Sequence, residues 1–112
     1  MIVTILYPGD RTIRVEIEGS TREEILENAF AAFNHGSGQE HETLNGRPGC
    51  RSMCTRDFVK LDDVWFQCES IGWKEVTEDY VNEIEHEVVN HPLYKEHGGW
   101  FALSEVMYQK RK

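Results

Sequence analysis

The sequence has no long hydrophobic segment and few cysteines, and each shortage narrows the class of protein. No apolar run approaches the ~20 residues that a membrane-spanning helix needs, so we expect no membrane association. The first ten residues, MIVTILYPGD, lack a basic region ahead of the apolar ones and do not resemble a signal peptide. Three cysteines, an odd number, do not predict a disulfide framework in a chain without an export signal. We therefore expect a cytoplasmic protein.

Positive charge is also scarce. The 20 acidic residues outnumber the 12 lysines and arginines, which gives a net charge of -8. Such a surface repels a nucleic-acid backbone, so the composition argues against broad nucleic-acid binding. It leaves open a basic partner or mimicry of a polyanion.

The hydrophobic pattern predicts one α+β domain over residues 1–112. Two pairs of apolar segments joined by turn residues, at 2–18 and 58–71, predict two β-hairpins. Apolar residues at helical spacing predict a helix over 20–34. We expect an antiparallel sheet of about four strands, packed against this helix and against carboxy-terminal helices. The residues at 35–50 have no core-forming pattern and predict a long polar loop.

Helix boundaries are marked by capping residues. Ser20 and Glu23 have the spacing of a capping box at the start of the first helix. Thr77 is expected to cap a second helix. A last helix is expected after Gly98, with a buried stripe formed by Trp100, Leu103 and Met107.

Metal binding is a hypothesis that the cysteines and histidines raise. Three thiolates and one imidazole from Cys50, Cys54, Cys68, His35 and His41 match the donors of a zinc site. The chain has no C-x2-C pair, however, and Cys68 lies within an expected strand, where a cysteine is typically a small buried hydrophobe. The spacing favours no metal and no cofactor, and zinc binding by these cysteines stays open.

No catalytic constellation is evident. Cys54 would have a lowered thiol pKa if Arg51 and Arg56 converged on it, but no spacing brings a histidine to it as a base. We assign no catalytic residue and expect no enzymatic activity.

A basic segment between Arg47 and Lys60 stands out in this acidic chain. Arginine forks bind carboxylates and phosphates bidentately, so Arg51 and Arg56 form a candidate anion clamp. Alternatively, they neutralise acidic groups of the protein itself. Trp73 either stacks on a ligand or covers the core. The residues singled out for ligand binding are His35, Arg47, Arg51, Ser52, Arg56 and Trp73.

An acidic helix is the second candidate surface. Residues 77–97 contain six acidic residues and a single lysine. Rows of carboxylates dock on basic partners, although they also form the solvent face of ordinary amphipathic helices. The residues assigned to this acidic face are Glu78, Asp79, Glu83 and Glu87.

Part of the chain resembles the YodL-like family, small proteins carried largely by phages, plasmids and Firmicutes genomes and mostly without assigned function. The resemblance is carried by Arg51-Ser52-Met53, Asp57-Phe58-Val59, Trp65-Phe66-Gln67-Cys68, Gly72-Trp73 and the segment Asn34 to Gly38. Where the family motif has Ser-Val-Gly, this chain has Cys54-Thr55-Arg56, so any positive-φ turn there falls on Arg56. Arg51, Ser52 and Asp57 fit a structural role at the entry to a hairpin.

Three functions follow as hypotheses. The first is an accessory protein of a mobile element that binds a host protein, with inhibition of host defence as one form of that activity. It would bind through the acidic helix, the loop at 35–57, or both. The second is a protein that binds or sequesters a small anion through Arg51 and Arg56. The third is nucleic-acid binding through Arg47, Arg51, Arg56, Lys60 and Trp73.

Overall fold

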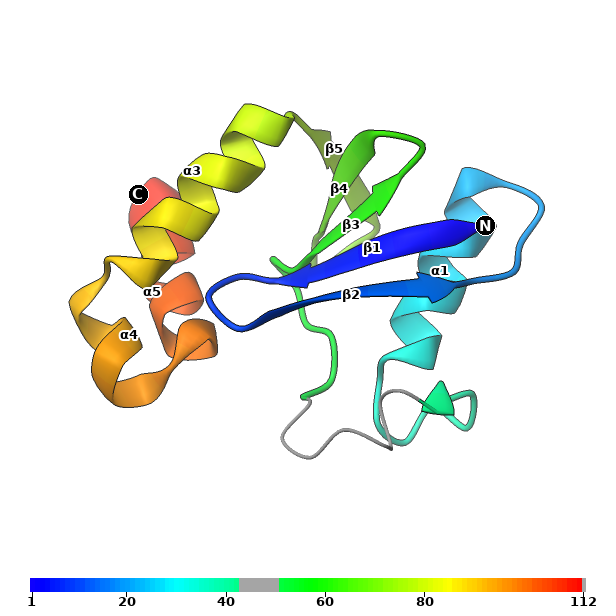
Figure 1. The fold of residues 1–112 in the computed structure, drawn as a ribbon, viewed down its shortest axis with the longest axis horizontal. Coiled ribbons are helices and arrows are strands. Elements are labelled where there is room, and N and C mark those ends of the chain that lie inside the picture. The colour runs from blue at the N-terminus through cyan, green and yellow to red at the C-terminus, as the bar shows by residue number, and fades with distance from the viewer. Residues whose placement is uncertain (43–50, 112) are drawn as a thin grey trace.

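The computed structural model describes residues 1–42 and 51–111, and a five-stranded antiparallel sheet lies at its centre (Figure 1). The strand order is β2-β1-β3-β4-β5. The strands are β1 (Ile2–Tyr7), β2 (Arg11–Glu16), β3 (Phe58–Leu61), β4 (Val64–Cys68) and β5 (Trp73–Val76). The predicted α+β class is confirmed, and the sheet has one strand more than the four expected.

The extra strand arises because β4 ends earlier than the apolar pattern suggests. A tight turn follows Cys68, in which the N–H of Glu69 donates to the carbonyl of Gly72 at 3.0 Å. Gly72 has a φ of +73°, which glycine adopts at little cost. The chain then returns along β4 as β5.

The described residues form helices α1 (Arg22–Ala32), α3 (Glu78–Val89), α4 (Pro92–His97) and α5 (Gly99–Arg111). The cap of α1 is one residue later than predicted. Thr21, not Ser20, accepts the hydrogen bond, from the N–H of Glu24 at 3.1 Å, and the Glu24 carboxylate accepts from Ser20 N–H. Thr77 caps α3 as predicted, by accepting from Tyr80 N–H.

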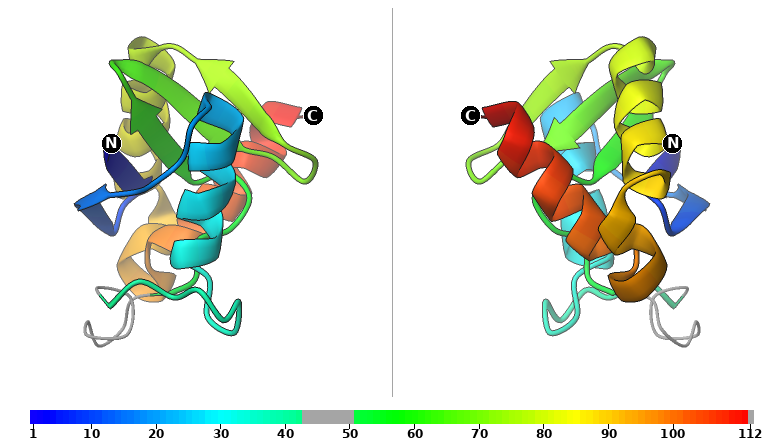
Figure 2. Two further views of the ribbon diagram at one scale, coloured as in Figure 1. Left: turned by 90° about the vertical axis from the view of Figure 1, so that its right-hand side faces the viewer. Right: turned by 90° about the vertical axis from the view of Figure 1, so that its left-hand side faces the viewer.

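Two hydrophobic cores lie on opposite faces of the sheet. Residues of α1 pack on one face, and residues of α3 and α5 pack on the other (Figure 2). Alternation along the strands feeds both cores, since Val59 and Phe66 belong to the first and Phe58 and Trp65 to the second.

Two glycines hold the helical end of the molecule against the first hairpin. A Cβ on Gly99 would lie 2.5 Å from the carbonyl oxygen of Pro8, so only glycine fits at the start of α5. Gly9 approaches the Gly99 Cα and also donates its N–H to the Glu85 carboxylate at 3.1 and 3.2 Å. The start of α5 therefore packs directly against the backbone of the β1–β2 turn.

This contact sets the rotation of α5 and corrects one expectation. Leu103 and Met107 are buried as predicted, together with Ala102 and Val106, but Trp100 is 43% exposed. The buried stripe begins at Gly99, because that residue meets the turn and turns the next side chain outward.

Candidate functional site

The loop ahead of β3 is organised by a buried ion pair. The Arg51 guanidinium contacts the Asp57 carboxylate through two parallel hydrogen bonds of 2.7 and 2.8 Å. Asp57 is wholly inaccessible to solvent and also accepts from the N–H of Cys54 at 2.8 Å. The guanidinium lies 4.6 Å from the ring centroid of Tyr7. This geometry is the alternative in which Arg51 neutralises an acid of its own chain.

Burial acts on both partners of this pair. It raises the pKa of Asp57, and the hydrogen bonds and charge of Arg51 oppose that shift. It lowers the pKa of Arg51, but the bonds and charge of Asp57 outweigh this effect and leave a net increase. The bidentate geometry requires an ionised carboxylate, so we assign both groups as charged at neutral pH.

Ser52 and its neighbours tie the loop to the end of α1. The Ser52 hydroxyl accepts from the N–H of His35 at 2.8 Å, and the N–H of Met53 donates to the carbonyl of Phe33 at 2.7 Å. The structure therefore brings Ser52 and His35 together, as the binding hypothesis requires. The hydrogen bond between them, however, holds the loop backbone at the end of α1.

Arg56 makes the strained turn that the sequence assigned to it. Its φ is +83°, and its N–H donates to the carbonyl of Cys68 at 2.6 Å. Its Nε is buried without a hydrogen-bond partner among the described residues. The Arg51 guanidinium is already bonded to Asp57, so it is not available for a joint anion clamp with Arg56.

Two of the remaining basic and aromatic candidates have contacts within the fold. Trp73 is half-buried against the first core, and Lys60 lies 5.7 Å from the Trp65 ring centroid. Arg47 lies outside the described residues. The geometry therefore gives no support to the anion clamp or to the nucleic-acid surface.

The acidic face of α3 is partly neutralised by α5. Lys110 contacts Glu83 at 3.1 Å and Glu87 at 3.2 Å. Glu78 and Asp79 lie in the first turn of α3, where carboxylates interact favourably with the helix dipole. Both pairs of acids thus have a role within the fold.

The cysteines do not gather around a metal in the described part of the chain. Residues 1–42 and 51–111 hold no group of three or more His, Cys, Asp or Glu placed to bind one. Burial raises the pKa of Cys68 to about 12, which keeps its thiol protonated. Cys50 lies outside the described residues. In the described residues no helix is long and apolar enough to cross a membrane.

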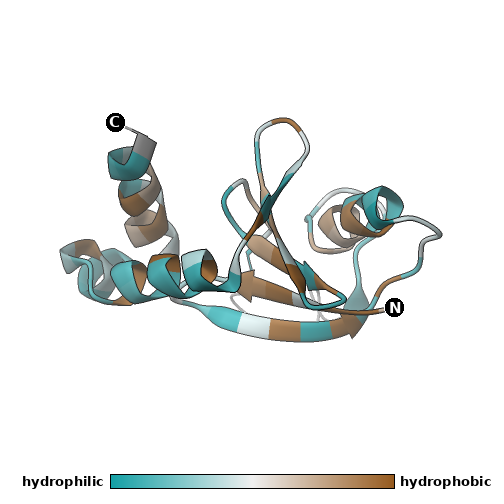
Figure 3. Ribbon diagram, turned by 90° about the horizontal axis from the view of Figure 1, so that it is seen from above, coloured by the Kyte–Doolittle hydropathy of each residue, from teal (hydrophilic) through white to brown (hydrophobic). Residues whose placement is uncertain are grey.

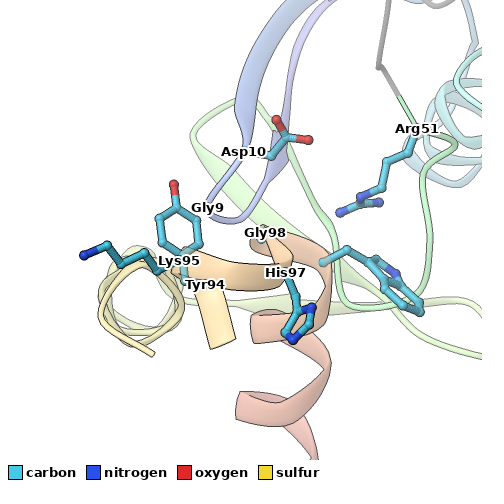
Figure 4. A pocket seen from close by; sticks show the side chains of 9 residues that line it. Gly9, Asp10, Arg51, Tyr94, Lys95, His97 and Gly98 are labelled. Atoms are coloured by element: carbon cyan, nitrogen blue, oxygen red, sulfur yellow. The ribbon is translucent and has the colours of Figure 1, made fainter. Parts of the chain in front are cut away.

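A pocket of about 600 Å³ lies where α4 meets α5 (Figure 4). It is lined by the β1–β2 turn, by Arg51, by Tyr94 and Lys95, and by the residues from His97 to Trp100. Arg51 enters it from one side, and Lys95 lies on the other. Arg51 is paired with Asp57, and Asp10 contacts Arg11 at 3.4 Å, so two of the charged groups at the pocket already have partners within the chain.

Three rings form an aromatic cluster beside this pocket: His97, Trp100 and Phe101. The rings of Trp100 and Phe101 meet edge to face with centroids 5.2 Å apart, and the His97 ring lies 5.4 Å from that of Phe101. Phe101 is 51% exposed. Large apolar side chains gathered on a surface are typical of binding sites.

Sequence reasoning missed this cluster. Trp100 was assigned to the core, although adjacent aromatic residues at the start of a helix cannot both lie on one narrow buried face. That adjacency was the available signal. The pocket itself left no signal in the sequence, because it is formed by segments about 40 to 90 residues apart in the chain.

Comparison of the chain with protein-family models, curated proteins and solved structures finds no match. The resemblance to the YodL-like family stays a prediction.

Proposed function

We propose that this chain is a binding protein that recognises a partner protein through the aromatic cluster at the corner of α4 and α5. The observation that carries the proposal is the packing of Trp100 against Phe101 in an exposed position beside a pocket. Aromatic anchors of this kind supply a large share of binding energy in protein interfaces.

The rigidity of this corner supports the proposal. The contact between Gly9 and Gly99 and the bond from Gly9 to Glu85 fix the start of α5 against the sheet. A surface held in place loses little conformational entropy on binding. The pocket next to Trp100 would receive a side chain of the partner.

The corner is a better candidate than the acidic face of α3. A basic partner would have to displace Lys110 from Glu83 and Glu87 before it could use those carboxylates. Trp100 and Phe101 need no such exchange. We include in this proposal that the chain belongs to a mobile element and that its partner is a protein of the host. This part rests on the resemblance to the YodL-like family and on the small size and acidity of the chain.

Photo-crosslinking tests the surface directly. We expect a photoreactive phenylalanine analogue at position 101, in the intact chain expressed in a native host, to yield one discrete protein adduct. The same analogue at Ile71, which is 93% exposed on the β4–β5 turn, is the matched control and should not yield that adduct. Trp100→Ala should abolish the adduct from position 101 while changing the free energy of unfolding by no more than about 1 kcal/mol.

Two results would contradict the proposal. One is the same adduct from both positions, which would indicate nonspecific capture. The other is an adduct that survives Trp100→Ala, which would place the contact outside the aromatic cluster.

A further inference from the structure

Strand β2 forms one edge of the sheet and lies at the rim of the molecule (Figure 3). Its sequence alternates polar and apolar residues from Thr12 to Glu16. It contains no proline, and no charged side chain points into the core. Edge prolines and inward-pointing charges are common means of preventing an edge strand from pairing with another chain, and β2 has neither.

The hydrogen bonds to β1 show which backbone groups of β2 face outward. Met1 and Ile17 exchange two bonds, of 2.9 and 3.0 Å, so they form a hydrogen-bonded pair. Antiparallel ladders alternate between bonded and non-bonded pairs, so Val15 and Ile13 also bond to β1. The N–H and C=O groups of Thr12, Arg14 and Glu16 therefore point away from the sheet.

We propose that two copies of this chain associate through their β2 edges in antiparallel orientation, with a two-fold axis at Val15. In this register Arg14 lies opposite Glu16 of the partner subunit, and symmetry repeats the pair. Opposite charges directly across an antiparallel pair are stabilising. The pairing extends the five-stranded sheet into one continuous sheet across both subunits.

The sequence selects this register over its neighbours. A shift of two residues in one direction places Arg14 opposite Arg14 of the partner subunit, and in the other direction it places Glu16 opposite Glu16 of the partner subunit. Like charges directly opposite one another are destabilising. A shift of one residue turns the apolar face of one strand toward the polar face of the other. In the proposed register the polar side chains of both subunits share one face.

The charged groups are available for this contact. Arg14 is exposed and takes part in no ion pair recorded among the described residues. Glu16 contacts the Met1 amine through Oε1 at 2.7 Å, in an exposed pair. Such a surface pair contributes little to stability. The second carboxylate oxygen of Glu16, Oε2, can accept a hydrogen bond from the guanidinium of the partner subunit's Arg14. The association does not involve the aromatic cluster and does not depend on the proposed function.

Strand β5, the other edge, is a poorer candidate. It has four residues against the six of β2. Cys68 directs its N–H to Asp57 of the preceding segment, so alternation leaves only Trp73 and Glu75 with outward-facing backbone groups on β5.

Charge-swap variants test the register. Sedimentation of the full chain at loading concentrations from about 5 µM to about 500 µM covers the weak association expected of a small interface. We expect the native protein to dimerise in this range. Arg14→Glu and Glu16→Arg should each raise the dissociation constant by about tenfold or more, because each places like charges opposite one another. The double variant Arg14→Glu plus Glu16→Arg should restore dimerisation.

Lys74→Glu is the matched control, since it makes the same change of charge on the β5 edge and should leave the dimer intact. Circular dichroism of every variant checks the fold. Hydrogen exchange provides a second readout: the amides of Arg14 and Glu16 should gain protection as concentration rises, and those of Trp73 and Glu75 should not. A native protein that stays monomeric up to about 500 µM would overturn the proposal. So would a dimer that persists in Arg14→Glu, or a double variant that fails to recover.

Discussion

Among single residues, Asp57 has the largest influence on the loop ahead of β3. Its carboxylate receives both arms of the Arg51 guanidinium and the N–H of Cys54, at a position closed to solvent. Removal of one member of a buried ion pair leaves the other without a counter-charge, which costs more than the pair gains by forming.

Substitution of this acid should therefore be severe. We expect Asp57→Asn to lower the free energy of unfolding by about 3–5 kcal/mol, measured by urea denaturation. Asp63→Asn is the control, because that side chain is 99% exposed and its contact with Lys60 is 3.8 Å. The control should change stability by less than about 0.5 kcal/mol. Equal losses in both variants would show that the Arg51–Asp57 pair has no special weight.

Glu85 should give the protein a pH dependence of a definite sign. Burial raises its pKa above the ordinary value of 4.5, and the hydrogen bond from Gly9 N–H opposes the shift. Its contribution to stability is therefore fully present below pH 4.5 and is lost as pH rises through the folded pKa. The stability of the native protein relative to Glu85→Gln should fall between pH 4.5 and neutrality. Urea denaturation of both proteins across this range measures that difference, and a constant or rising difference would contradict the assignment.

At the scale of secondary-structure elements, the contact between the β1–β2 turn and the start of α5 determines where the helical end lies. Val88 and Tyr94 also approach Gly9, so three helices converge on one turn. A side chain at Gly99 would have to push α5 off the Pro8 carbonyl.

We expect Gly99→Ala to lower the free energy of unfolding by more than about 2 kcal/mol, since it overpacks a backbone contact. Gly36→Ala is the control: nothing lies near its Cβ, and its cost of about 1 kcal/mol comes from its positive φ alone. Thermal or urea unfolding measures both. Similar losses would show that the contact at Gly99 tolerates a methyl group.

The elements that the sequence predicts well are those with a strong local pattern. The alternation in β2 and the helical spacing in α3 identify both elements, and Thr77 marks the cap of α3. Strand β5 was missed because the apolar Ile71 continues the pattern of β4, although it lies exposed in the turn that Glu69 and Gly72 close. The cap of α1 differs by one residue because Thr21 and Glu24 have the same capping-box spacing as Ser20 and Glu23, and the sequence does not choose between the two pairs.

The candidate site was less predictable than the fold. The sequence points to Arg51 as one of few cations in an acidic chain, but its partner Asp57 lies six residues away and only the folded loop brings their side chains together. Trp100 is exposed because Gly99 packs against the β1–β2 turn. No local sequence pattern predicts that contact between Gly99 and the turn. A site that depends on contacts between distant segments needs the structure.

At the scale of the whole molecule, one sheet separates two cores, and the two proposed contacts with other chains lie on different surfaces. The aromatic cluster lies at the corner of α4 and α5, and the β2 edge lies along the rim of the sheet. The two proposed contacts use different elements, so a dimer would present two aromatic clusters. A partner protein could then be bound twice by one assembly.

The packing of Gly99 against Gly9 also has a consequence during synthesis on the ribosome. The hairpin of β1 and β2 emerges before α5, and Gly99 follows Gly9 by 90 positions in the chain. At roughly 5–20 residues per second, the hairpin waits about 5–18 s before its final helix is made. Through that interval the nascent chain exposes apolar strands and an open edge, the features that chaperones bind, so the speed of translation itself sets how long this protein is vulnerable to aggregation.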